Sequence, residues 1–142
     1  MGLYLCVFEG DEEIEGVEVG SYSDFDFFLS SVTDLLEGGK AGSRYPVLTL
    51  PVLTPPSEFG GEWSPAHCKT LAEELKAVSQ AFRALPAVEF RSAWQKEVAK
   101  SLGLKPTSLY ESFIDVDGEP LLERLLKLCE VAIDRQQPIL FQ

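Results

Sequence analysis

The segment from Leu3 to Phe8 constrains the fold more than any other part of the chain, because it is apolar on both of its alternating sides. A strand with one exposed face alternates apolar and polar residues, whereas a strand covered on both faces does not. The segment therefore predicts a central strand. Gly10 and Asp11 predict a turn, and apolar residues resume at Ile14, which predicts a hairpin with an acidic rim and a bulge at Gly16.

Four later segments have apolar residues at the spacing of an α-helix, with capping residues at their ends. The predicted helices are residues 23–37 after the N-cap Ser23, residues 65–85 after the N-cap Ser64, residues 92–102 before Gly103, and residues 119–135 before Pro138. Such a pattern of early strands and later helices is typical of an α+β protein.

Shorter elements complete the predicted domain. Val47–Leu50, between two prolines, predicts an edge strand, and residues 51–62 predict a loop rich in proline and glycine. Ile139–Phe141 predicts a final short strand. We therefore expect a single α+β domain over residues 1–142, in which a small mixed or antiparallel sheet is packed with about four helices.

Charge is distributed very unevenly along the chain. The first 39 residues contain ten acidic residues and no Lys, Arg or His, and the whole chain has a formal net charge of −11. Crowded like charges repel one another in a folded protein, but their field can steer a basic partner into fast encounter. The candidate contact residues of this region are Asp11, Glu12, Glu13, Glu15, Glu18, Asp24, Phe27 and Asp34.

Phe27 is the one aromatic residue in that set. On a helix whose apolar face includes Phe25 and Phe28, the step of about 100° per residue places Phe27 on the outer face, with Asp24 and Asp34 on its flanks. An aromatic side chain ringed by carboxylates is suited to bind a basic partner. The alternative is that Phe27 packs under the loop at residues 51–62.

Composition excludes several functional classes. The acidic balance disfavours binding to nucleic acid or to anionic membrane surfaces, which both depend on Lys and Arg. No apolar run is long enough to span a bilayer, and no signal peptide is recognisable at the N-terminus, so we expect a cytoplasmic protein. The three cysteines have no metal-binding spacing and are expected to be reduced.

Two motifs imitate catalytic sites. Asp115 and Asp117 follow an apolar lead-in, as do the paired aspartates of a metal-dependent phosphatase or hydrolase, but too little chain follows to complete such a site. The simpler interpretation is that Asp117 or Gly118 caps the final helix. His67 is adjacent to Cys68, and adjacent helical side chains point about 100° apart, so no catalytic pair is expected. The sequence predicts no catalytic residue, metal or cofactor.

Three segments resemble a known family. Met1–Cys6, Tyr110–Leu122 and Pro138–Gln142 are similar to the immunity protein 70 family, whose members are assigned to bacterial polymorphic toxin systems. The resemblance implies a small intracellular protein that binds a toxin made by its own cell or kin and blocks it without chemistry. It carries no contact residues with it.

The interpretation from residues alone agrees with this resemblance. An acidic surface is suited to capture a basic toxin domain, such as a nuclease, by imitating its substrate. We therefore expect a non-enzymatic immunity protein whose hairpin and first helix contact a basic cognate toxin. The alternatives are a small metal-dependent phosphatase or hydrolase that uses Asp115 and Asp117, and an adaptor subunit whose acidic face contacts some ordinary cellular protein.

Overall fold

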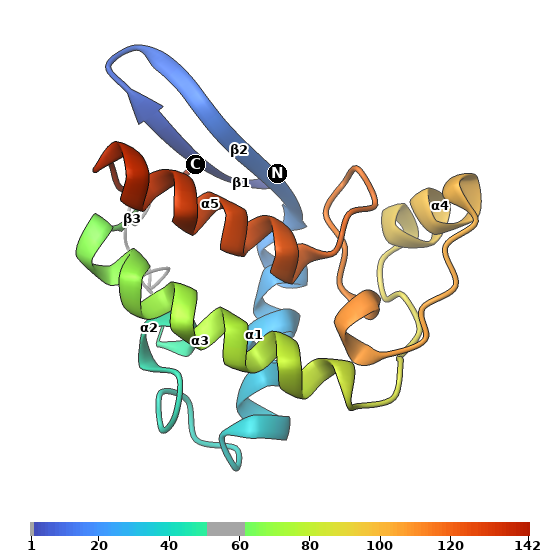
Figure 1. Ribbon diagram of the computed structural model, residues 1–142. Helices are drawn as coiled ribbons and strands as arrows, with labels where there is room; N and C mark the ends of the chain where they lie inside the picture. Colours follow the sequence, from blue (N-terminus) through green and yellow to red (C-terminus); the bar gives the residue numbers. More distant parts are fainter. Residues whose placement is uncertain (1, 51–61) are drawn as a thin grey trace.

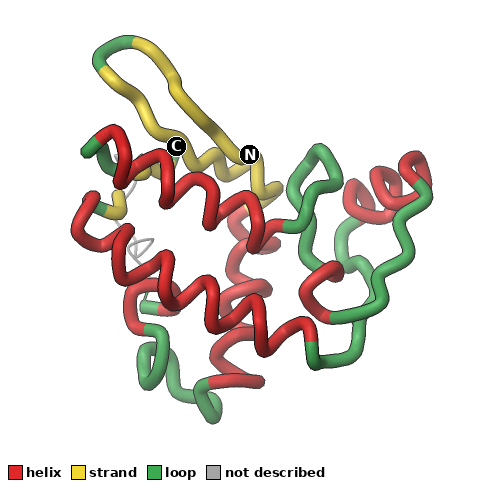
Figure 2. Tube along the Cα trace, viewed as in Figure 1, coloured by secondary structure: helices red, strands yellow, loops and turns green. Residues whose placement is uncertain are grey.

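The computed structural model describes residues 2–50 and 62–142 as one small α+β domain (Figures 1 and 2), which confirms the expected fold class. Its elements in chain order are β1 (Gly2–Glu9), β2 (Glu12–Ser21), α1 (Tyr22–Leu36), α2 (Pro46–Thr49), β3 (Glu62–Trp63), α3 (Pro65–Arg83), α4 (Ala93–Leu102), the 3₁₀ helix η1 (Leu109–Ser112), α5 (Leu121–Arg135) and β4 (Ile139–Phe141).

The four strands form one antiparallel sheet in the order β2-β1-β4-β3, with β1 inside it as its sequence predicts. The predicted bulge at Gly16 is wrong, because Gly16 lies directly opposite Cys6, and the register instead shifts beside Tyr4 and beside Phe8. Gly16 serves another purpose. A Cβ at this position would lie 1.9 Å from the Tyr4 Oη, so the absence of a side chain makes room for the tyrosine.

Three helices bury the core against the sheet. α5 contacts both strands of the hairpin, β1 and β2, and also contacts α3. Figure 1 shows α5 lying between the hairpin and α3. Phe28 of α1 is at the centre, with its ring centroid 5.1 Å from that of Phe113 and 6.3 Å from that of Phe82. Aromatic rings at these separations add to the apolar area that the core removes from water.

The first helix begins earlier than predicted. Its N-cap is Ser21 rather than Ser23, because the Ser21 hydroxyl accepts a bond from the Asp24 N–H and the Asp24 carboxylate accepts one from the Ser21 N–H. This reciprocal capping box satisfies two backbone donors at once. The N-cap Ser64 of α3 and the left-handed C-cap Gly103 of α4 are confirmed.

The predicted strand Val47–Leu50 is wrong, since Pro46–Thr49 form the short helix α2. Proline at the first helical position suits a helix as well as a strand edge. The carboxylate of Glu74, on α3, decides between them by accepting from the N–H groups of Val47 at 3.4 Å and Leu48 at 2.9 Å. The edge of the sheet is instead occupied by β3. Residues 51–61 of the predicted loop lie outside the described residues.

α4 stands at the edge of the domain rather than in its core (Figure 1). Leu102, the last residue of α4, is 57% exposed, while Trp94 and Val98 are half-buried. The Trp94 Nε1 donates to the Asp24 carboxylate at 2.9 Å, so α4 is tied to the beginning of α1.

Candidate functional site

Six of the ten acidic residues in the first 39 positions lie on the hairpin of β1 and β2, which extends beyond the rest of the sheet (Figure 1). β1 pairs with β4 at Leu5 and Cys6 and with the following Gln142 at Tyr4, so the hairpin beyond Cys6 has no third strand beside it among the described residues. A two-stranded ribbon alone is marginally stable in water. The hairpin must therefore be held by contacts other than those of the sheet.

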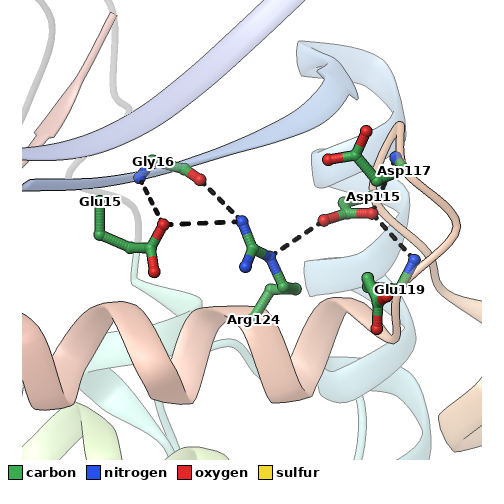
Figure 3. A network of polar contacts seen from close by, with 6 residues as sticks. All are labelled: Glu15, Gly16, Asp115, Asp117, Glu119 and Arg124. Atoms are coloured by element: carbon green, nitrogen blue, oxygen red, sulfur yellow. Dashed lines mark hydrogen bonds and ion pairs between the residues drawn. The ribbon is translucent and has the colours of Figure 1, made fainter.

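Arg124 of α5 provides the main such contact (Figure 3). Its Nη2 donates to the Gly16 carbonyl at 2.9 Å and lies 3.9 Å from a Glu15 carboxylate oxygen. Its Nε donates to the Asp115 carboxylate at 3.1 Å. One guanidinium thus joins β2 to the turn that precedes α5, and we call these contacts of Arg124 the arginine clamp. Planar, permanently charged arginine is suited to several simultaneous bonds of this kind.

Asp115 is a structural residue in this arrangement. It is 1% exposed, and its Oδ1 accepts from the N–H groups of Asp117 at 2.9 Å and Glu119 at 3.0 Å. Because Arg124 occupies its other oxygen, Asp115 has donors on both sides. The Asp117 side chain is exposed, and its carboxylate makes no hydrogen bond with another described residue. The two aspartates therefore differ: Asp115 is bonded within the fold, whereas the Asp117 carboxylate faces solvent.

The turn also corrects the expected helix cap. The N-cap of α5 is Pro120, not Asp117 or Gly118, and it makes no side-chain cap bond. Asp115 instead closes the loop that leads into the helix, by accepting from the N–H groups of Asp117 and Glu119. Across residues 2–50 and 62–142, no group of three or more His, Cys, Asp or Glu side chains is placed to hold a metal ion. His67 is exposed and Cys68 buried, as their spacing predicts.

Four acids of the hairpin remain turned to solvent. Asp11, Glu12, Glu13 and Glu18 are exposed and make no ion pair with another described residue, and we call these four the acidic hairpin surface. Two other acids of the hairpin form ion pairs with α5. Glu15 belongs to the arginine clamp, and a carboxylate oxygen of Glu9 lies 3.2 Å from the Arg135 Nη1.

The family model of Immunity protein 70 matches residues 3–141, almost the whole chain. The chain belongs to the immunity protein 70 family. Membership in the immunity protein 70 family implies an immunity protein that acts against a toxin, and immunity proteins of this kind are generally not enzymes. No curated protein and no solved structure matches the chain. No helix within the described residues is long and apolar enough to cross a membrane.

The candidate contact residues of the first helix are placed differently from those of the hairpin. Asp24 is 9% exposed and accepts from Ser21, Ser92 and Trp94. Desolvation on burial would raise the pKa of the Asp24 carboxyl, but these hydrogen bonds outweigh it and lower the pKa. Its carboxylate is thus committed to the fold and is not free to bind a partner. Asp34 is exposed in the last turn of α1, which leads away from the hairpin (Figure 1).

The surroundings of Phe27 differ from those that its sequence neighbours suggest, because Asp24 is buried and an arginine lies over the ring. Phe27 is 37% exposed, its ring centroid is 5.9 Å from that of Phe113, and the Arg91 guanidinium lies over its outer face at 4.8 Å. Such a contact covers part of the ring and gives it a basic neighbour. Sequence reasoning missed Arg91 here and Arg124 in the arginine clamp, because the Phe27 ring and the Gly16 carbonyl that they contact lie far away in the chain.

Proposed function

We propose that this member of the immunity protein 70 family is a non-enzymatic inhibitor that binds a cognate polymorphic toxin through the acidic hairpin surface. The observation that carries the proposal is the exposure of Asp11, Glu12, Glu13 and Glu18 on a hairpin whose inner acids are already paired with α5. The free carboxylates favour a basic toxin domain, because opposite charges on the two partners accelerate encounter and set its orientation.

Inhibition by binding alone agrees with the state of the aspartates. Asp115, the one buried carboxylate of the phosphatase-like motif, has hydrogen-bond donors on both of its oxygens. A nucleophile or general base needs an oxygen free to approach its substrate. The arrangement supports a structural role, and we propose no catalytic activity. We place the capture of the toxin in the cytoplasm, and nucleic acid is not among the proposed partners.

The first experiment identifies the partner. The tagged chain is used as bait in host lysate at low and then at high salt, and the eluted proteins are identified by mass spectrometry. Recovery of a basic toxin domain encoded beside the chain supports the proposal, and loss of that partner at high salt supports a charged contact. Recovery of an ordinary cellular protein instead would favour an adaptor subunit.

The second experiment locates the contact by charge reversal. Asp11, Glu12 and Glu13 are changed together to Lys, and the matched control changes Glu73, Glu97 and Glu123, exposed acids of three different helices, so that both variants alter net charge equally. We expect the hairpin variant to reduce the association rate with the toxin by about 10-fold or more at low salt, and the control to reduce it much less. Stopped-flow fluorescence measures both rates.

Equal losses in the two variants would mean that only net charge matters, and an unchanged rate in the hairpin variant would place the contact elsewhere. The reversal Asp34→Lys, measured separately, tests whether the contact extends along α1. Circular dichroism of each variant verifies that the fold is intact.

A further inference from the structure

A second candidate binding site lies on α4, away from the hairpin (Figure 1). A cavity of about 680 Å³ is bounded by α4, by the segment at residues 87–90 that precedes it and by residues 103–106 that follow it. Val88, Phe90, Ala99 and Leu104 give it an apolar lining. A concave apolar site of this size, with a few polar groups at its edge, is typical of ligand-binding sites in proteins.

The edge of this groove is basic, although the chain as a whole is strongly acidic. Lys96, Lys100 and Lys105 all line it, and none of them makes an ion pair with another described residue. Lys96 and Lys100 are four residues apart and therefore share one face of α4. Three lysines without ion pairs, against the single glutamate Glu89, line one apolar groove, which favours an occupant that combines carboxylates with apolar side chains.

The segment at residues 87–90 adds unsatisfied backbone groups. It is not part of a helix or strand, and Val88 donates its N–H to the Ser112 Oγ at 3.0 Å. The backbone N–H groups of Ala87, Glu89 and Phe90 make no hydrogen bond to another described residue. Val88 is 43% exposed. Exposed backbone without partners is a template for pairing with a second extended chain.

We propose that this groove binds an extended acidic peptide segment, whose carboxylates pair with the three lysines while its apolar side chains enter the groove. The segment at residues 87–90 pairs with the backbone of the peptide. A peptide suits the site better than a nucleic acid does, because it brings apolar side chains for the apolar lining and a backbone that can pair with residues 87–90. The site is independent of the toxin contact proposed above.

The test uses the whole chain labelled with ¹⁵N and a synthetic peptide of about eight residues that alternates aspartate with valine, long enough to span roughly 26 Å when extended. A peptide with lysine in place of aspartate and a single-stranded oligonucleotide of equal charge are the comparison ligands. We expect saturable amide shifts at residues 87–90 and 96–105 with the acidic peptide and none with the basic one.

A variant series assigns the effect to the lysines. Lys96→Glu with Lys100→Glu should weaken binding about 10-fold or more, whereas Lys69→Glu with Lys76→Glu, both exposed on α3, should change it little. The proposal is overturned if the wild-type chain shows no saturable shifts, if the shifts lie outside the groove, or if the oligonucleotide binds as tightly as the peptide. The wild-type shift map decides the question even if the lysine variant does not fold.

Discussion

Replacing Asp115 with Asn separates the structural role of this residue from a catalytic one. The change keeps the size of the side chain and retains an oxygen that can accept from the N–H groups of Asp117 and Glu119. It puts an amide N–H group where the second oxygen receives the Arg124 Nε at 3.1 Å. Two donors then face each other, and the arginine loses its buried counter-charge.

The expected cost follows from the surroundings of this pair. Removing one partner of a buried ion pair costs about 3–5 kcal/mol. The Arg124 side chain is 25% exposed and keeps its bond to the Gly16 carbonyl, so water and that bond offset part of the loss. We therefore expect Asp115→Asn to lower the free energy of unfolding by about 2–3 kcal/mol.

Asp117→Asn is the matched control. The Asp117 carboxylate is exposed and makes no hydrogen bond with another described residue, since only its backbone N–H is used in the turn. This change should alter the free energy of unfolding by less than about 0.5 kcal/mol. Urea unfolding followed by circular dichroism measures both variants, and at a slope of about 2 kcal/mol per molar urea the Asp115 variant should unfold about 1 M earlier.

A double-mutant cycle with Arg124→Ala tests the cause of the loss. If the arginine contact carries the cost, Asp115→Asn should be less damaging in the Arg124→Ala background, with a coupling of about 1 kcal/mol or more. Equal stability losses at Asp115 and Asp117, or a coupling near zero, would refute the reasoning. A hydrolytic activity that Asp115→Asn abolishes without loss of stability would restore the phosphatase alternative.

Two further predictions follow from buried groups. Asp24 has a lowered pKa in the folded state, so its contribution to stability is complete above the unfolded pKa of about 3.9 and is lost as the pH falls through the folded pKa. In urea unfolding, the loss of unfolding free energy caused by Asp24→Asn should therefore become smaller between neutral pH and about pH 2.5. A loss that stays constant over this range would contradict the argument. Cys6, Cys68 and Cys129 are buried, and burial raises the pKa of the Cys6 thiol to about 11. A colorimetric thiol reagent should consequently react with none of them in the native chain and with all three in urea, and fast labelling of the native chain would show that the core opens readily.

Elements whose structure depends only on residues close by in the sequence could be predicted from the sequence. The two-sided apolar pattern of β1, the cap-and-proline start of α3 and the glycine end of α4 each depend on neighbours a few residues away. The errors occur where distant residues decide. Ser21–Asp24 and Ser23–Asp26 have the same capping spacing, and Asp24 selects the first because Ser92 and Trp94, 68 and 70 positions further along the chain, bond to its carboxylate.

The same distinction applies to the candidate site. The exposure of the hairpin acids follows from the turn and its charge pattern, and the structure shows Asp11, Glu12, Glu13 and Glu18 at the surface. Asp24 could not be recognised as a buried acid, because two of its donors, Ser92 and Trp94, come from the start of α4. The role of Asp115 depends equally on Arg124, a residue whose sequence context indicates only a partly buried helix.

Some acids of the hairpin form ion pairs with α5, whereas others face solvent, and this difference gives the proposed surface a physical basis. Like charges on a two-stranded ribbon repel one another, and a ribbon of this length is marginally stable alone. Arg124 and Arg135 of α5 bind Glu15 and Glu9, which lie on different strands. Each strand is thereby attached to the same helix. The neutralised pairs lie against α5, while the unpaired acids face solvent.

This attachment affects binding as well as stability. A partner that must first order a loose hairpin binds with lower affinity, because part of the binding free energy is used to order the hairpin. A hairpin that is already held in place presents its charges without this loss. Loosening the arginine clamp by Arg124→Ala removes none of the four carboxylates of the acidic hairpin surface. A weaker affinity for the toxin in this variant would therefore report the value of holding the hairpin, separately from the value of its charge.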